Sequence, residues 1–175
     1  SEERKSKEHT QREKGFESAE DAFAFTEGSL GDKRLAWMYA MQDLYEDFPE
    51  DREVAAFTAV SMLSGATVSQ DDRVLNNFLT ESGTEISMQA GAIAMDLFRE
   101  NPNHPGAAHY IIHSFDHPTY APLALTAAEK YASIAPAVSH ARHMPTHIFI
   151  QHGMWDKVAE WNDSCLLYTS DAADE

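Results

Sequence analysis

The chain has 175 residues, 43% of them hydrophobic, which suits one folded domain with a buried core rather than a disordered segment. Its formal net charge of −16 argues against a nucleic-acid-binding surface, which needs a basic patch, and favours cationic partners. The sequence contains no apolar run long enough to form a membrane-spanning segment and no visible signal peptide, so we expect a soluble protein.

Hydrophobic residues recur with helical spacing through nearly the whole chain, and no alternating strand pattern stands out. The sequence therefore predicts an all-α protein of about seven to eight helices. In chain order, the expected helices lie within residues 7–25, 33–48, 51–63, 86–99, 105–115, 121–134, 139–152 and 155–164.

Residues typical of helix ends mark several of these boundaries. Asp32 is the expected N-cap of the second helix, and Pro49 ends that helix. Residues 64–72, SGATVSQDD, predict a loop, followed by a short and weakly amphipathic segment up to Thr80. Pro145 lies inside the helix expected over residues 139–152, where it either kinks the helix or marks its true start.

Two segments of the C-terminal half repeat each other at an offset of 34 residues: NPNHPGAAHYIIHSF from Asn101 and APAVSHARHMPTHIF from Ala135. The pairs that coincide are Pro102 and Pro136, Ala107 and Ala141, His109 and His143, His113 and His147, and Phe115 and Phe149. This period, with two helices in each unit, is typical of tetratricopeptide repeats, whose helical hairpins stack into a superhelix with a concave groove.

The stretches NPNHPGAAHYIIHSFDHPTYAPLALTAAEKYASIAP and HARHMPTHIFIQHGMWDKVAEWN resemble a family of bacterial tetratricopeptide-repeat proteins. The resemblance implies a helical repeat domain over residues 32–164, preceded by an N-terminal helix and linker over residues 1–31. The match is partial, because Ile112 stands where the repeat pattern has glycine or alanine. Arg142 and Pro145 also stand at positions that are usually small or apolar. The resemblance implies a fold, an α-helical solenoid, and no particular reaction.

The last eleven residues, CLLYTSDAADE, resemble the translation of a sequencing-library adapter. We interpret residues 165–175 as a non-native tail on a metagenomic fragment; the alternative is a disordered acidic tail. We therefore expect the solenoid to be incomplete at its C-terminus, and also at its N-terminus because the chain begins at Ser1. Without a native cysteine or a true N-terminus, the sequence leaves both a cytoplasmic and a periplasmic location open.

Eight of the nine histidines lie between His104 and His152. His109 and His113 are one helical turn apart, as are His143 and His147, so each pair shares a helix face. Helices that stack on each other lie roughly 8–10 Å apart, so we expect the two pairs to meet. By the family resemblance, the residues that face the groove are Gly106, His109, His113, Asp116 and His117 from one repeat, and His140, His143, His147, Ile150 and Gln151 from the next.

The favoured function is recognition of a peptide, a protein or a small ligand in this histidine-lined concave groove. Imidazoles that become cationic near pH 6–7 would bind acidic groups more tightly as the pH falls, and Arg142 would add a fixed charge. The candidate ligand-binding residues are His109, His113, Asp116, His117, His140, Arg142, His143, His147 and Gln151.

The alternative function is metal binding, because two histidine pairs of this spacing supply four nitrogen ligands for zinc, nickel or copper. The candidate ligands are His109, His113, His143 and His147, with Asp116 as a further ligand or as the acceptor that orients a ring. An open coordination position would allow metal-dependent hydrolysis. The HExxH signature is absent from the sequence, however, and the sequence favours a binding protein over an enzyme.

A purely structural role is the third interpretation of the histidines. Histidines near helix ends cap backbone groups and stack on aromatic rings, here those of Tyr110 and Phe149. On this interpretation His104 and His152 belong to caps and turns, and His9 is a solvated surface residue.

Overall fold

The computed structural model describes residues 10–71, 82–134, 136 and 138–171, and all regular structure in these residues is helical. The elements are α1 (Gln11–Phe25), α2 (Leu30–Asp47), α3 (Arg52–Asp71), α5 (Ser82–Glu100), α6 (Pro105–Ser114), the 3-10 turn η1 (Ala121–Leu123), α7 (Leu125–Ile134), α8 (Ser139–His143), α9 (Pro145–Gln151) and α10 (Trp155–Asp171). The all-α class is confirmed. The described residues form eight helices when α8 and α9 are counted as two halves of one.

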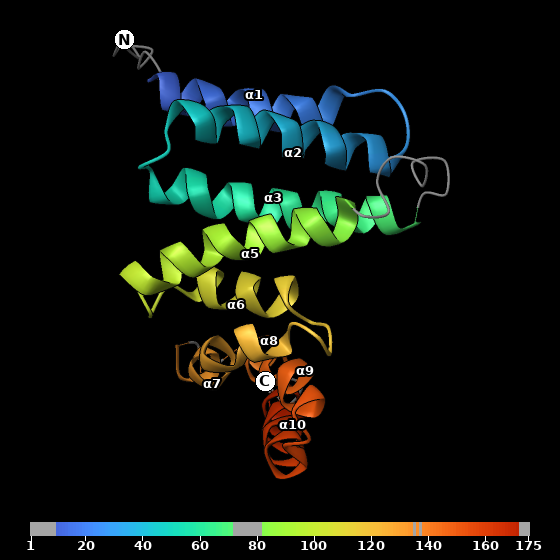
Figure 1. The fold of residues 1–175 in the computed structure, drawn as a ribbon, viewed down its shortest axis with the longest axis vertical. Coiled ribbons are helices and arrows are strands. Elements are labelled where there is room, and N and C mark those ends of the chain that lie inside the picture. Colours follow the sequence, from blue (N-terminus) through green and yellow to red (C-terminus); the bar gives the residue numbers. More distant parts are fainter. Residues whose placement is uncertain (1–9, 72–81, 135, 137, 172–175) are drawn as a thin grey trace, which may run out of the picture.

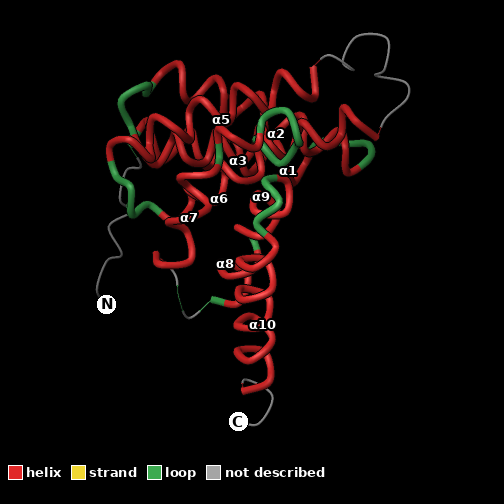
Figure 2. The backbone as a smooth tube through the Cα atoms, turned by 60° about the horizontal axis from the view of Figure 1, so that its bottom comes forward, coloured by secondary structure: helices red, strands yellow, loops and turns green. Residues whose placement is uncertain are grey.

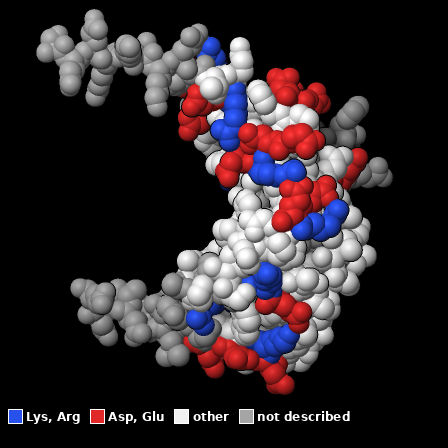
Figure 3. All heavy atoms as spheres, turned by 90° about the vertical axis from the view of Figure 1, so that its left-hand side faces the viewer, with Lys and Arg blue, Asp and Glu red and all other residues white. Residues whose placement is uncertain are grey.

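The helices stack in the order of the sequence. From α1 to α7 each helix packs on its neighbours along the chain, and α10 packs on α8 and α9. Figure 1 shows the stack running from α1 at one end to α10 at the other, and Figure 2 shows α10 lying across the direction of the N-terminal helices. The outline in Figure 3 is a crescent that is hollowed on one side. The predicted solenoid of helical hairpins is confirmed at this level.

Reciprocal capping fixes the starts of α1 and α2. Thr10 and Glu13 form a capping box at α1, and Ser29 and Asp32 form another at α2. Asp32 is therefore not the N-cap of α2, as the sequence predicted, but the third residue of the helix. Its carboxylate accepts the Ser29 backbone N–H at 2.7 Å, so the start of the helix moves to Leu30.

The loop predicted over residues 64–72 is wrong for residues 64–71, because α3 continues to Asp71. Ala66 and Val68 are buried, and Gly65, which has no side chain, lets Met38 of α2 pack closely against α3. Burial of this segment overrides its loop-like composition, since propensity is a weak guide where tertiary packing decides. The segment predicted up to Thr80 lies outside the described residues.

Pro145 begins a helix, which was one of the two expected outcomes. The chain breaks at Met144 between α8 and α9, and Pro145 occupies the first turn of α9, where its missing N–H needs no partner. The helix expected over residues 121–134 is likewise divided into η1 and α7. The final helix, expected to end at Ser164, runs to Asp171, since residues 165–171 contain no glycine or proline to stop it.

The C-terminal half has the larger hydrophobic core. Buried Ile and Phe side chains from α6 and α9 pack against alanines of α7 and α8; the largest are Ile111, Ile112, Phe115, Ile148 and Phe149. Ile112, which departs from the repeat pattern, is fully buried in this core. No helix among the described residues is both long and apolar enough to cross a lipid bilayer.

Candidate functional site

Helix α6 carries the first histidine pair on its solvent side. His104 is the N-cap, and its ring Nδ1 accepts the Ala107 backbone N–H at 3.1 Å, which confirms its expected capping role. Ala108, Ile111 and Ile112 are buried beneath the helix. His109 and His113 lie beside this apolar stripe, with their Nε2 atoms 3.0 Å apart.

His140 of α8 joins this pair from the next repeat. Its Nε2 lies 3.1 Å from Nε2 of His109, and the ring nitrogens of His109, His113 and His140 all lie within 4.8 Å of one another. We call these three residues the histidine triad. It brings two helices together through residues that are 31 positions apart in the sequence.

Aromatic packing holds the central ring of the triad. His109 stacks on Tyr131 of α7 with ring centres 5.4 Å apart and nearly parallel planes, and on Tyr110 at 6.0 Å. The contact with Tyr110 was expected, whereas that with Tyr131 was not. His109 is consequently less exposed than His113 and His140.

The surroundings of His109 and His113 favour neutral imidazole at these two residues. Burial, followed by the neighbouring His113 and His140, lowers the pKa of His109 to about 4. The pKa of His113 is also lowered, mainly by burial and then by His140 and His147, while Asp116 opposes the shift. The expectation that these rings become cationic near pH 6–7 is therefore wrong for His109. A neutral imidazole ring keeps a lone pair on one nitrogen, and this neutral form is the one that binds metals.

The second histidine pair forms a separate group with acidic and amide side chains. Nε2 of His147 lies 3.1 Å from Nε2 of His143, and Nδ1 of His147 lies 2.8 Å from an Asp116 carboxylate oxygen. Gln151 donates its side-chain amide to the other oxygen of Asp116. Nδ1 of His143 lies 3.2 Å from the side-chain oxygen of Asn162 on α10. We call His143, His147 and Asp116 the second histidine group.

The structure thus divides the candidate residues differently from the sequence. Among the described residues, the group of three with converging ligand atoms contains His140, whereas the sequence placed His143 and His147 with His109 and His113. Neither His117 nor Arg142 belongs to the two groups: His117 Nδ1 accepts the Thr119 backbone N–H, and Arg142 donates to the Pro136 carbonyl. Tyr131 and Asn162 were missed because both lie on other helices, at spacings that carry no signal in the sequence.

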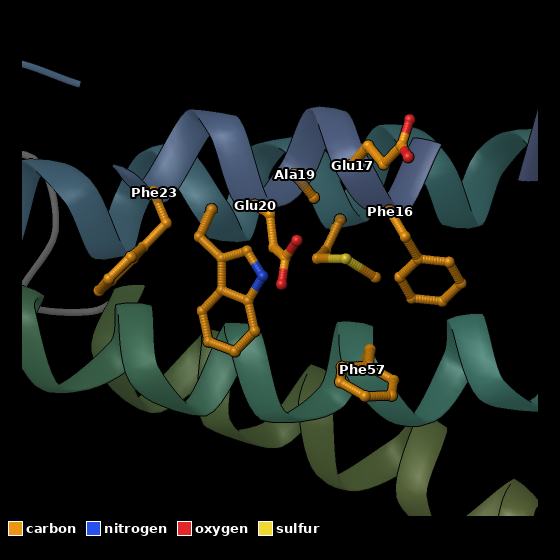
Figure 4. Close-up of a pocket in the computed structure, with 8 residues that line it drawn as sticks. Phe16, Glu17, Ala19, Glu20, Phe23 and Phe57 are labelled. Carbon is orange, nitrogen blue, oxygen red and sulfur yellow. The ribbon is translucent and has the colours of Figure 1, made fainter. Parts of the chain in front are cut away.

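A cavity of about 470 Å³ lies at the other end of the stack, between α1, α2 and α3. Figure 4 shows Phe16, Glu20 and Phe23 pointing from α1 toward α3, where Phe57 lies below Phe16. Phe16 packs edge-on against Phe57 with ring centres 5.5 Å apart, and Phe23 against Trp37 at 6.3 Å. The lining is Phe16, Glu17, Ala19, Glu20, Phe23, Trp37, Met41 and Phe57. An aromatic surface edged by carboxylates suits an apolar ligand with a positive charge.

No protein-family model matches this sequence, and no curated protein is significantly similar to it. The crystal structure of MamA superposes on the chain with a TM-score of 0.45 and 14% sequence identity, covering 86% of this chain and 100% of that one.

Proposed function

We propose that the protein binds a divalent transition-metal ion, zinc or copper, through Nε2 of the histidine triad. The observation that carries this proposal is the convergence of three ring nitrogens at 3.0 and 3.1 Å from two helices. Imidazole is a preferred ligand of zinc and copper.

The spacing of the nitrogens supports coordination. Zinc binds histidine nitrogen at about 2.0–2.1 Å, which places two ligands of a tetrahedral ion about 3.3 Å apart. The two separations from His109 are shorter than that by only a few tenths of an ångström, and all three ligand atoms lie within 4.8 Å of one another, so side-chain rotations can admit the ion. Three protein ligands leave a fourth position for water or another ligand.

The neutral state of His109 favours a metal over an anionic ligand. With its pKa lowered to about 4, His109 is neutral at physiological pH, so it offers a lone pair to a cation and no charge to an anion. The formal net charge of −16 adds a long-range attraction for cations. Recognition of acidic groups by a cationic imidazole is correspondingly disfavoured at His109.

Elemental analysis of the purified, tag-free chain tests the proposal, followed by thermal melting with and without chelator. We expect about one or more equivalents of metal and a melting temperature that falls when the metal is removed. His109→Gln combined with His140→Gln should remove most of the chelator effect, whereas His117→Ala, a histidine outside both groups, should retain it in full. Wild-type protein that neither holds metal nor gains stability from added zinc or copper would overturn the proposal.

A second candidate function is recognition of a peptide at the cavity between α1, α2 and α3. Phe57 is 46% exposed and Phe23 39%, although both are large apolar side chains. Glu17 and Glu20 supply negative charge at the same cavity. We propose as occupant a peptide segment with apolar side chains flanking a lysine or arginine, which suits both the aromatic lining and the charge.

Nuclear magnetic resonance of the Trp37 indole N–H tests this second function, with a capped peptide of alternating leucine and lysine as the probe. The lysine peptide should shift that resonance in a saturable manner, and the same peptide with glutamate in place of lysine should not. Glu20→Gln should weaken binding, while Glu160→Gln on α10 serves as the matched control. Equal binding of both peptides, or none, would contradict the proposal.

A further inference from the structure

The two rings of the second histidine group each make a hydrogen bond through Nδ1, and these bonds indicate which ring nitrogens carry the hydrogens. Nδ1 of His147 faces an Asp116 carboxylate oxygen at 2.8 Å. A carboxylate oxygen can only accept, so Nδ1 of His147 carries the hydrogen. The Nε2 atom of the neutral ring is then left with a lone pair.

His143 has a comparable hydrogen-bond partner, Asn162, which lies on α10. Its Nδ1 faces the side-chain oxygen of Asn162 at 3.2 Å, and an amide oxygen also only accepts. With the Asn162 amide in this orientation, Nδ1 of His143 carries the hydrogen and Nε2 holds the lone pair.

The two Nε2 lone pairs consequently face each other across 3.1 Å. Two acceptors at this distance repel, so the arrangement needs a positive charge between them, either a shared proton or a metal ion. Two nitrogens at about 2.0–2.1 Å from one ion lie roughly 2.9 Å apart at a right angle and 3.3 Å apart at a tetrahedral angle. The observed separation falls within this range.

The surroundings match a metal site better than a proton bridge. Histidine ligands commonly donate their outer nitrogen to a carboxylate or carbonyl, which fixes the tautomer and makes the inner nitrogen more basic. Both rings have such a partner here, and Gln151 in turn orients Asp116 by donating to its second oxygen. His147 and Asp116 are about one-third exposed, so an ion has access from solvent.

We propose that Nε2 of His143 and Nε2 of His147 form a second site for a divalent transition-metal ion, separate from the histidine triad, with Asp116 and Asn162 as positioning residues. With only two protein ligands, this site binds more weakly than the triad and leaves more coordination positions open. The two sites are neighbours, because His113 of the triad interacts electrostatically with His147 and Asp116. Two cations this close repel, so filling the triad weakens the second site further.

Equilibrium titration of the tag-free, metal-free chain with cobalt or zinc, against a chromophoric chelator, tests the proposal. We expect two resolved steps in the wild type. His143→Gln combined with His147→Gln should remove the weaker step and keep the tighter one. His117→Ala should keep both, and circular dichroism should show that each variant retains its helices.

Substitutions of Asp116 and Asn162 should change the metal affinity of the second site, which a merely structural role of these two residues would not do. Asp116→Asn should weaken the second step about tenfold or more, because loss of an outer-shell partner typically costs 10–100-fold in metal affinity. Asn162→Asp should tighten that step, because a carboxylate makes His143 a more basic ligand. In both variants the metal affinity of the first, tighter step should change less than that of the second.

The experiments distinguish a wrong proposal for the second site from a wrong proposal of metal binding at the triad. A chain with His109→Gln and His140→Gln should still bind one ion at the second group, whatever happens at the triad. A single step in the wild type that survives the loss of His143 and His147 would overturn the second site alone. A proton shared between the two Nε2 atoms, seen as a downfield resonance that zinc does not displace, would also overturn it.

Discussion

The N-terminal and C-terminal halves of the stack build their structure from different kinds of helix. Helices α1 to α5 are 15–20 residues long, whereas α6 to α9 are 5–10 residues long, before the final helix α10 of 17 residues. Alanine is common in both cores, but the large buried side chains differ: Met38, Met41 and Met62 in the N-terminal half, and isoleucine and phenylalanine in the C-terminal half. No histidine occurs between residues 10 and 103.

The difference shows how short helices assemble a polar site on a stacked fold. The break at Met144 separates α8 from α9, so His140 reaches α6 while His147 reaches Asp116. The long helices α1, α2 and α3 pack side by side and leave between them a cavity lined by aromatic side chains, Glu17 and Glu20. The C-terminal half thus gains two histidine groups where the N-terminal half has an aromatic pocket.

The largest expected effect comes from the C-terminal core. Phe149→Ala should lower the free energy of unfolding by about 3–5 kcal/mol, because the side chain is fully buried against Trp161 and leaves a cavity. Ile150→Ala, one residue away and 47% exposed, is the matched control and should cost far less. Urea denaturation followed by circular dichroism measures both. Similar losses in the two variants would contradict the assigned core.

Metal should stabilise the C-terminal half selectively. At a free zinc concentration about 100 times the dissociation constant, the triad should gain about 2.7 kcal/mol of stability. Hydrogen exchange should slow in α6 and α8, with little change in α1 and α2. Uniform protection of both halves would show that the two regions unfold as one unit.

Gly91 tests how tightly the two halves are joined. A Cβ atom on this residue of α5 would collide with the ring of Phe115 and with Ser114 of α6. Gly91→Ala should therefore cost about 1–3 kcal/mol despite its better helix propensity. Gln89→Ala on the exposed side of the same helix should be nearly neutral. If Gly91→Ala is stabilising in urea denaturation, α5 and α6 are packed less closely than described.

The smallest expected effect is a pH dependence from His109. Its folded pKa of about 4 lies below the ordinary value of 6.5, so the unfolded chain binds the proton more readily. The stability contributed by the neutral ring is complete above about pH 6.5 and is lost as the pH falls to about 4. After allowance for solvent screening, we expect metal-free protein to lose about 1–2 kcal/mol over this range.

Urea denaturation of chelator-treated protein at several pH values measures this loss. His109→Gln removes the titrating ring and should flatten that part of the profile. A profile that is the same with and without His109 would contradict its lowered pKa.

Much of the fold could be predicted because its signals are local. The 34-residue offset and the prolines at 105 and 145 set the helical units of the C-terminal half, and His104 was expected as a cap. The error at residues 64–71 arose because Gly65 and Ser64 look like loop residues until the packing of α3 on α2 is known. Asp32 was misplaced for a different, local reason, since a capping box makes Ser29, three residues earlier, the N-cap.

The site was predicted less completely because its contacts cross between helices. Spacing along the chain shows that His109 and His113 share a face, but not that His140 is the residue of the next repeat that meets them. The same limit hid the stacking of Tyr131 and the contact of Asn162 with His143. The lowered pKa of His109 depends on burial, which the sequence pattern does not reveal.

Anomalous X-ray scattering at the zinc edge, from crystals of the tag-free chain grown with zinc, tests the central claim most directly. We expect an anomalous peak about 2.0–2.1 Å from Nε2 of His109, His113 and His140. Well-ordered triad rings without a peak between them, at a zinc concentration that saturates the protein in solution, would contradict the claim.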